Sequence, residues 1–365
     1  MQNLDFFYET PLKTIKFINR KQFVSNQKTL IIGSPQSGKT SLMCEYLAQY
    51  KAEERLYINL KDLRADPLNL LTDLSEFLAA HPSLKALGVD NLSSQNEAEI
   101  LKKIDTSTLE TIIIATDQRS FRFENFSVLE LGYLDYEEFI LFFKKNLDAN
   151  FLFSHFLAHG GAIKCAFLDA SEVSESLQND LKKELSPVNL NIIKECASKC
   201  HDTVSAFEIY KILKQSVKIS KDSVYAGLNE LENSGFIITL PKFNEPNATK
   251  KLYFRNFALR NTLSAKKDFT ATFANVILCE LLKFKDEIFY TKELDFFLIK
   301  RKLTVLCIPF SASEIIFLKF KKLHPLLKNL NVSRLQVISV ANSGEMSIEG
   351  IKCEILPFSR WALGI

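Results

Sequence analysis

The chain has 365 residues, of which 47% are hydrophobic and 24% are charged, and its net charge is +3. This length exceeds the usual size of one compact core, so two or three domains are expected. The composition excludes a disordered or fibrous protein, and no apolar run reaches the length of a membrane span. Residues 1–13 lack the features of a secretion signal, so we expect a cytoplasmic protein with no membrane partner.

The small net charge conceals two regions of opposite sign. Residues 1–180 carry 18 Lys and Arg against 25 Asp and Glu, whereas residues 181–330 carry 25 against 15. An acidic half joined to a basic half indicates domains with different partners. The basic half is suited to an anionic partner, such as duplex DNA.

The first strand, loop and helix predicted along the chain form a phosphate-binding loop. Thr29–Ile32 is a short apolar run typical of a buried parallel strand, and helical spacing begins at Ser41. Between them stands the pattern Gly-x-x-x-x-Gly-Lys-Thr, in which backbone N–H groups and the start of the helix attract phosphates. Lys39 is expected to contact the β- and γ-phosphates of ATP, and Thr40 to ligate Mg²⁺. The residues expected to bind ATP are Gly33, Ser34, Gly38, Lys39, Thr40 and Ser41.

The next two predicted strands place a second magnesium ligand. Leu56–Leu60 forms one strand, and Ala86–Val89 forms another that ends in Asp90. A ligand of the metal is expected at the carboxyl end of a neighbouring parallel strand, so we assign Mg²⁺ binding to Asp90, with a plain turn residue as the alternative. In hydrolysing proteins of this class the following residue is commonly a glutamate that activates water. Here it is Asn91, whose amide cannot take a proton from water.

Thr111–Ala115 predicts a further strand, and Asp117 follows it closely. A carboxylate in this place could act as the general base that activates water, a role that the amide of Asn91 cannot perform. An ordinary turn at the end of the strand fits the sequence equally well. Asn91 and Asp117 are therefore the two candidate catalytic positions.

Residues 202–254 have the layout of a winged helix. Ala206–Lys214 and Lys221–Asn233 predict two helices, and a hairpin follows them. Such modules place the second helix in the major groove of DNA. This helix carries acidic residues that repel phosphate, whereas the wing carries Lys242, Lys250 and Lys251. Contact with DNA and contact with another protein both remain open.

The last hundred residues predict a helix followed by three strands, as in the core of restriction-endonuclease-like domains. A nuclease of that type needs an aspartate at one strand and Glu-x-Lys on the next, to hold Mg²⁺ and activate water. Asp295 can stand for the first, but Cys307–Pro309 occupy the place of the pair. We therefore expect a degenerate domain that does not cut DNA.

Several segments, taken in order, resemble one family. They are GSPQSGKTSL, LGVDNL, IIIATDQ and LPFSRWAL, and only the first is specific by itself. The chain resembles the prokaryotic AAA-type P-loop ATPases that carry a C-terminal winged helix and a domain related to restriction endonucleases. The resemblance covers nearly the whole chain, with Asn91 as a departure where the family tends to have glutamate.

The resemblance implies an α/β fold with three domains. A P-loop parallel sheet with a helical lid at 133–185 would occupy residues 1–185. A winged helix would follow at 186–262, and a small nuclease-like α/β domain at 263–365.

The sequence predicts an ATP-binding protein of AAA type that hydrolyses ATP slowly or not at all. It would act as a nucleotide-dependent switch for a nucleic-acid or protein partner. One alternative is an active ATPase that uses Asp117, or a residue of a partner, as base. Another is a DNA-binding protein whose ATP site is structural.

Overall fold

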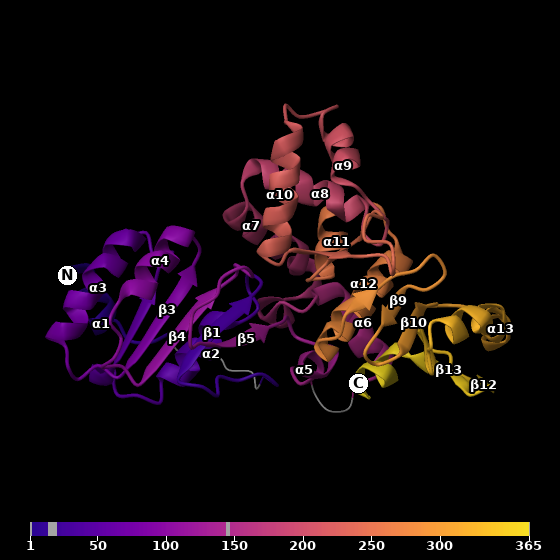
Figure 1. Cartoon of the computed structure of the whole chain (residues 1–365), viewed down its shortest axis with the longest axis horizontal. Helices are drawn as coiled ribbons and strands as arrows, with labels where there is room; N and C mark the ends of the chain where they lie inside the picture. The colour runs from indigo at the N-terminus through magenta and orange to yellow at the C-terminus, as the bar shows by residue number, and fades with distance from the viewer. Residues whose placement is uncertain (1, 14–19, 144–146, 365) are drawn as a thin grey trace. The chain divides into compact units, whose positions relative to one another are not determined.

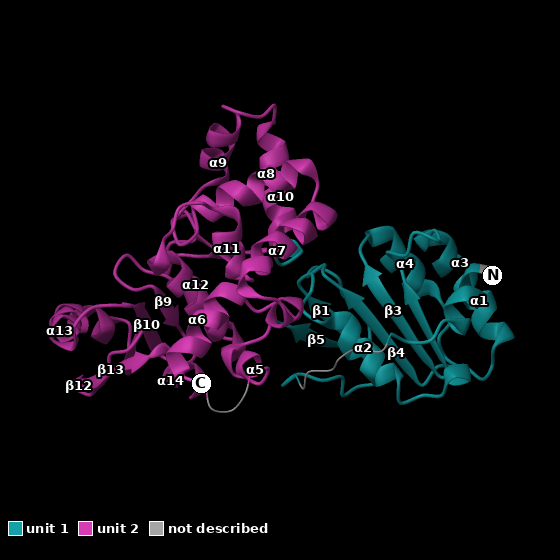
Figure 2. Cartoon of the chain, turned by 180° about the vertical axis from the view of Figure 1, so that it is seen from behind, with its two compact units in different colours: residues 1–133, 233–235 teal, residues 134–232, 236–365 magenta. Residues whose placement is uncertain are grey.

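The computed structural model describes residues 2–13, 20–143 and 147–364. These residues form two compact units, shown in different colours in Figure 2. Unit 1 comprises residues 1–133 and 233–235, and unit 2 comprises residues 134–232 and 236–365. All but the first residue of the expected lid at 133–185 thus belongs to unit 2. The three-domain division itself stays a prediction.

Unit 1 is an α/β unit built on a parallel sheet (Figure 1). Its helices are α1 (Gln2–Glu9), α2 (Lys39–Leu47), α3 (Pro67–Ala80) and α4 (Gln95–Lys103), with a short 3-10 helix η1 (Ala52–Glu54). Its strands are β1 (Lys28–Gly33), β2 (Arg55–Asn59), β3 (Ala86–Leu92), β4 (Thr111–Thr116) and β5 (Ser127–Leu131). The strands predicted from residue 29, residue 56 and residue 111 are therefore confirmed to within one residue.

The sheet of unit 1 has the strand order β2-β3-β4-β1-β5, and all its pairings are parallel. Successive side chains of a strand face opposite sides, so the apolar strands bury both faces. Leu30 and Ile32 face the core that α1, α3 and α4 help to form, and Ile31 faces α2. Because β4 separates β1 from β3, the residue after β4 lies between the phosphate loop and Asp90.

The expected end of the third strand requires a correction. Asp90 lies inside β3, which runs on to Leu92, and not at the point where the strand ends. Between the pairs Val89–Ile114 and Leu92–Thr116, three steps along β3 match two steps along β4. This extra residue is a β-bulge, and bulges redirect side chains beside sites. Alternation of apolar residues cannot reveal such an insertion.

Unit 2 contains the remaining elements (Figure 1). Its helices are α5 (Tyr136–Ile140), α6 (Ala149–His159), η2 (Ile163–Phe167), α7 (Ala170–Glu184), α8 (Pro187–Ser198), α9 (Ala206–Leu213), α10 (Lys221–Asn233), α11 (Ala258–Leu263), α12 (Phe269–Leu281), η3 (Leu282–Phe284), α13 (Ser313–Asn329) and α14 (Phe358–Leu363). Its strands are β6 (Ile237–Leu240), β7 (Lys251–Phe254), β8 (Ile288–Phe289), β9 (Phe296–Leu298), β10 (Leu303–Cys307), β11 (Arg334–Ser339), β12 (Gly344–Ile348) and β13 (Ile351–Pro357). The last residue of α10 is grouped with unit 1.

The larger sheet of unit 2 is mixed, with the order β12-β13-β11-β10-β9-β8. Leu335 and Val337 of β11 pack on α13 at one face, and the other face packs on α12 and α14. Phe139 of α5 and Phe156 of α6 belong to the same core as α12. Of the helices in the expected lid, α5 and α6 therefore share a core with the C-terminal sheet.

Two helices and a hairpin occur where the winged helix is expected. α9 and α10 match the predicted helices, and β6 pairs with β7 in antiparallel fashion. Gly235 after α10 has the left-handed φ of 75° that ends a helix. Within the described ranges, no helix combines the length and the apolar character needed to cross a bilayer.

Candidate nucleotide-binding site

The loop between β1 and α2 needs glycine at both of its ends. Gly38 has φ 99°, a left-handed conformation that glycine adopts readily, and α2 begins at the next residue. A Cβ on Gly33 would lie 2.5 Å from Ser37 Oγ and 2.7 Å from the carbonyl oxygen of Leu131. Both glycines of the motif thus have a steric reason, which supports the identification of the loop.

Lys39 and Ser37 supply the polar groups at the centre of the loop. The buried Lys39 Nζ donates hydrogen bonds to the carbonyl oxygens of Gly33 at 2.7 Å and Ser34 at 3.0 Å. Ser37 Oγ is also buried and has no hydrogen-bond partner among the described residues. An orphaned hydroxyl beside a buried ammonium fits an anionic group such as phosphate. The residues present therefore fit the expected ATP.

The expected magnesium ligands lie together. Thr40 Oγ1 donates to Asp90 Oδ2 at 2.6 Å, which joins the first turn of α2 to β3. The hydroxyl of Tyr57 donates to the same Asp90 oxygen at 2.9 Å. Burial and the charge of Asp90 raise the pKa of Tyr57, so this hydroxyl keeps its proton. A threonine hydroxyl and a carboxylate are oxygen ligands of the kind that Mg²⁺ prefers.

The side chain of Asn91 is directed to the β2 side of β3. Its Nδ2 donates to Asn59 Oδ1 at 2.8 Å, and Asn59 ends β2. The same Asn59 oxygen accepts from the backbone N–H of Lys61 at 3.1 Å, which fixes its orientation. Asn91 has φ 62°, which asparagine tolerates better than most residues. The bulge and this bond place the amide away from β4 and β1.

Asp117 follows β4, the strand between β1 and β3. It is half-buried, and its Oδ1 accepts a hydrogen bond from Gln118 Nε2 at 2.8 Å. The preceding Thr116 is buried and donates to the carbonyl oxygen of Leu92 at 2.7 Å. The strand order thus places the Asp117 backbone between the phosphate loop and Asp90.

The other expected ATP ligands lie on the loop and at the start of α2. Ser41 is half-buried in the first turn of α2. Ser34 is buried, and its hydroxyl donates to the carbonyl oxygen of Gly235 at 2.7 Å, within the same unit. Ser34 therefore contributes its backbone rather than a free hydroxyl.

Two side chains that support the loop were not found by reasoning from the sequence. Arg20 donates to the carbonyl oxygens of Ser37 at 2.8 Å and Gly132 at 2.9 Å. The hydroxyl of Tyr133 donates to the carbonyl oxygen of Pro35 at 2.8 Å. Arg20 and Tyr133 lie outside the eight-residue loop motif, 17 and 98 residues from the loop residues that they contact. Tyr57 was missed for the same reason.

No protein-family model matches the chain, and no curated protein matches it. In structure it is similar to a STAND protein, a signal-transduction ATPase with a tetratricopeptide repeat sensor from Pyrococcus horikoshii. The identity is 14% over 71% of this chain and 43% of that protein, with a TM-score of 0.32, so the chain spans less than half of the STAND protein.

The chain is also similar to the ORC1 protein of Aeropyrum pernix, whose structure includes DNA. The identity is 12% over 66% of this chain and 87% of that protein, with a TM-score of 0.34. A third structure is Drosophila ORC bound to AT-rich DNA and Cdc6, at 13% identity over 64% of this chain and 84% of that chain, with a TM-score of 0.20. Because these TM-scores lie below 0.5, the functional assignment depends on the geometry of the loop and the sheet. The five-stranded parallel sheet is consistent with a P-loop NTPase core.

Proposed function

We propose that this protein is an ATP-binding protein of AAA type that hydrolyses ATP slowly and serves as a nucleotide-dependent switch. The observation that supports this most directly is the 2.6 Å bond between Thr40 and Asp90. It joins the hydroxyl of Thr40, the residue after Lys39 on α2, to the carboxylate of Asp90 on β3. That pairing is what a Mg²⁺-nucleotide requires and what a chance glycine-rich turn lacks.

Each residue of the site has a separate role in this proposal. The backbone N–H groups of the loop and Lys39 would hold the phosphates, and Thr40 and Asp90 would hold Mg²⁺. Bound Mg²⁺ supplies charge neutralisation on the phosphate oxygens. Tyr57 would keep the carboxylate of Asp90 turned toward Thr40, because it donates to the oxygen that Thr40 also contacts.

Slow hydrolysis is inferred from the residue after Asp90. An amide has no basic oxygen with a useful pKa, so Asn91 cannot act as general base. In addition, its bond to Asn59 holds it on the β2 side of β3. A general base typically contributes about a hundred- to ten-thousand-fold in rate, so its loss leaves a site that binds and rarely turns over.

An active ATPase with Asp117 as base is the second candidate. The position of β4 between β1 and β3 favours it, because the residue after β4 lies between the phosphate loop and Asp90. Asp117 is also half-exposed to solvent, and its hydrogen bond to Gln118 leaves it other lone pairs. In this candidate, Asp117→Asn would abolish a measurable rate.

A nucleic-acid partner is supported by a basic and aromatic patch on α9 and α10, where the winged helix is proposed. Phe207 and Tyr225 are 42% and 43% exposed. Lys221 Nζ lies 5.6 Å from the centroids of both rings, and Lys211 Nζ lies 4.6 Å from that of Phe207. Interleaved cations and aromatic rings suit phosphates and bases. The exposed Asp222 on the same helix weakens this footprint, so a protein partner is the other form of the proposal.

The test measures ATP binding and single-turnover hydrolysis side by side, with and without duplex DNA. Wild type should bind Mg-ATP and hydrolyse it on the order of hours, as unassisted P-loop sites do. Asn91→Glu should raise the rate without tightening binding, because a carboxylate acts on water and cannot donate to Asn59 Oδ1. Asn91→Gln is the matched control, since it has the same size without the base.

The outcomes separate the candidates. A brisk wild-type rate that Asp117→Asn abolishes would favour the active ATPase. A brisk rate that resists Asp117→Asn and falls in Asn91→Glu would defeat both candidates. DNA binding that weakens with salt and does not change when ATP is added would instead favour a DNA-binding protein with a structural nucleotide.

A further inference from the structure

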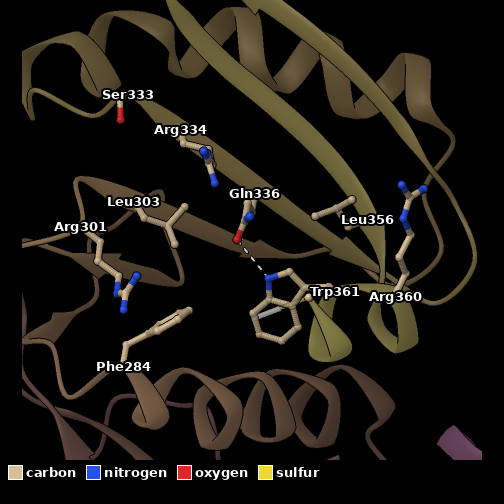
Figure 3. Close-up of a pocket in the computed structure, with 10 residues that line it drawn as sticks. Phe284, Arg301, Leu303, Ser333, Arg334, Gln336, Leu356, Arg360 and Trp361 are labelled. Carbon is tan, nitrogen blue, oxygen red and sulfur yellow. Dashed lines mark hydrogen bonds between the residues drawn. The ribbon is translucent and has the colours of Figure 1, made fainter. Parts of the chain in front are cut away.

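A cavity of about 600 Å³ lies in unit 2, on the face of the mixed sheet that packs against α12 and α14. Its lining comes from the strands β10, β11 and β13, the helices η3 and α14, and the adjoining turns. Figure 3 shows the residues: Phe284, Arg301, Leu303, Ser333, Arg334, Gln336, Leu356, Arg360, Trp361 and Gly364. Arg334 and Gln336 alternate along β11, so both face the cavity, while Leu335 faces α13. A volume of this size accommodates a small organic ligand.

The cavity is positively charged. Three arginines line it, and none of its lining residues is acidic. A counter-charge beside Arg334 is Glu354, whose carboxylate lies 3.7 Å from Arg334 Nε. Lys352 lies closer to Glu354, at 2.8 Å, so Arg334 shares this carboxylate with a nearer cation. Arginine forks bind phosphate and carboxylate in a bidentate manner, which makes an anion the expected ligand.

Arg301 is held in place at the turn before β10. The carboxylate of Asp286 accepts hydrogen bonds from the backbone N–H groups of Lys300 at 3.2 Å and Arg301 at 3.1 Å. The guanidinium of Arg301 lies 3.9 Å from the centroid of the Phe284 ring. In Figure 3, Arg301, Arg334 and Phe284 lie on one side of the Gln336–Trp361 pair, and Leu356 and Arg360 lie on the other.

The lining of the cavity also has an apolar part. Trp361 is buried, with 4% exposed, and its Nε1–H donates to Gln336 Oε1 at 3.0 Å. The indole thus has its hydrogen bond satisfied and presents carbon surface, together with Leu303, Leu356 and Phe284. Aromatic and aliphatic surface beside guanidinium groups suits a ligand that combines an anion with a flat ring.

We propose that this cavity binds a nucleotide, with the phosphate on Arg301 and Arg334 and the base against Trp361 and Phe284. The nucleotide could be free or could stand at the phosphorylated end of a nucleic-acid strand. The site is separate from the place of the missing nuclease residues. Asp295 contacts Cys307, at the carboxyl end of β10, whereas the cavity reaches Leu303 at its amino end. The inference does not depend on the phosphate loop of unit 1.

Trp361 makes a site-specific test possible, because it is the single tryptophan of the chain. The full chain carrying Lys39→Ala, which weakens the phosphate-loop site, is titrated while Trp361 fluorescence is recorded. The probes are AMP, adenosine, and a single-stranded oligonucleotide with and without a 5′-phosphate. AMP and the phosphorylated strand should change the fluorescence on binding. At least one of them should bind about tenfold or more tightly than its unphosphorylated counterpart, adenosine or the strand without the 5′-phosphate.

Substitutions then connect the signal to the arginines. Arg301→Ala and Arg334→Ala should each weaken the phosphorylated probe about tenfold or more. Arg334→Lys should lose less, because it keeps the charge and loses only the fork. Lys328→Ala on α13 is the control and should bind the probe like wild type. Arg301, Arg334 and Lys328 are all exposed, so each variant should keep the fold.

The source of the nucleotide is decided by the same titrations. Tighter binding of AMP than of the strand indicates a free nucleotide, and the reverse indicates a strand end. The proposal is overturned if adenosine binds as tightly as AMP and the phosphorylated strand has no advantage. It is also overturned if the arginine variants bind like wild type, or if no phosphorylated probe gives a fluorescence change or calorimetric heat at millimolar concentration.

Discussion

Each of the two α/β sheets has an aspartate at a position expected to hold Mg²⁺, and the surroundings of the two aspartates differ. In unit 1, Asp90 accepts hydrogen bonds from the hydroxyls of Thr40 and Tyr57. In unit 2, Asp295 accepts from the backbone N–H of Cys307 at 2.9 Å, and its other oxygen lies 3.5 Å from His201 and 3.8 Å from Lys251.

The neighbours decide what each carboxylate can do. A hydroxyl can share a cation with a carboxylate, so the pair of Thr40 and Asp90 suits Mg²⁺. The ammonium of Lys251 partly neutralises the carboxylate of Asp295 and repels a metal ion. Burial by itself raises the pKa of Asp295, but the neighbouring His201, the hydrogen bond from the backbone N–H of Cys307 and the charge of Lys251 outweigh this, and its pKa is lowered. Asp295 is therefore a structural anchor, in agreement with the absence of Glu-x-Lys after it.

The largest effect is expected for the anchor. Asp295→Ala should destabilise unit 2 by about 2–3 kcal/mol in denaturant unfolding, because it leaves the Lys251 ammonium, the His201 ring and a buried N–H without their partner. Since the folded-state pKa of Asp295 is lowered, its contribution is present above the unfolded pKa and is lost as the pH falls through the folded value. Asp222→Ala on the exposed face of α10 is the control and should cost little.

The same variant examines the expected lack of nuclease activity. Wild type should not cut DNA with Mg²⁺ or Mn²⁺, and Asp295→Ala should change stability without changing cleavage. Specific cleavage by wild type that disappears in Asp295→Ala would show that the two aspartates are alike, which would remove the distinction between the sheets.

The next effect concerns ATP affinity in unit 1. Lys39→Ala should weaken Mg-ATP binding tenfold or more in calorimetry, because it removes the loop's side-chain cation. Lys28→Ala, at the exposed amino end of β1, should leave the affinity unchanged. Equal affinities for Lys39→Ala and wild type would show that the loop is not a phosphate site.

The two units also differ in how much of each site could be predicted from the sequence. The phosphate loop is contiguous, so its motif stands within the eight residues from Gly33 to Thr40. The strand before it was predicted to within one residue, and the helix after it begins at Lys39, two residues before the predicted Ser41. The cavity of unit 2 draws Phe284, Arg301 and Trp361 from separate segments. No local pattern marks these residues, because only the fold brings them together.

Two other features depend on tertiary packing. The direction of the Asn91 side chain is set by a bulge and by Asn59, and neither changes the apolar pattern of β3. The aromatic residues of α5 and α6 form an apolar pattern that would be the same in either core. The sequence therefore did not show that they pack in unit 2. Periodicity predicts that a face is buried, and does not predict the partner that buries it.

The smallest effect is expected at a second buried carboxyl of unit 2, Glu280 on α12. Its Oε1 accepts from the backbone N–H of Tyr136 at 2.9 Å, and it forms an ion pair with Lys283. Burial, opposed by Lys283 and reinforced by the charge of Asp135, raises the pKa of Glu280 to about 7. Unlike Asp295, this group is held in a setting that favours its neutral form.

The sign of the pH dependence follows from that pKa. Because the folded value lies above the unfolded one, the stabilising contribution of the Glu280 proton is complete below the unfolded pKa and is lost as the pH rises through about 7. Glu280→Gln cannot titrate, so its Tm relative to wild type should rise by a few degrees between pH 5 and pH 8. The exposed Glu287→Gln should show no such trend. If the Tm of both variants relative to wild type changes with pH in the same way, Glu280 is charged in the folded protein. The ion pair with Lys283, and not burial, then determines its charge.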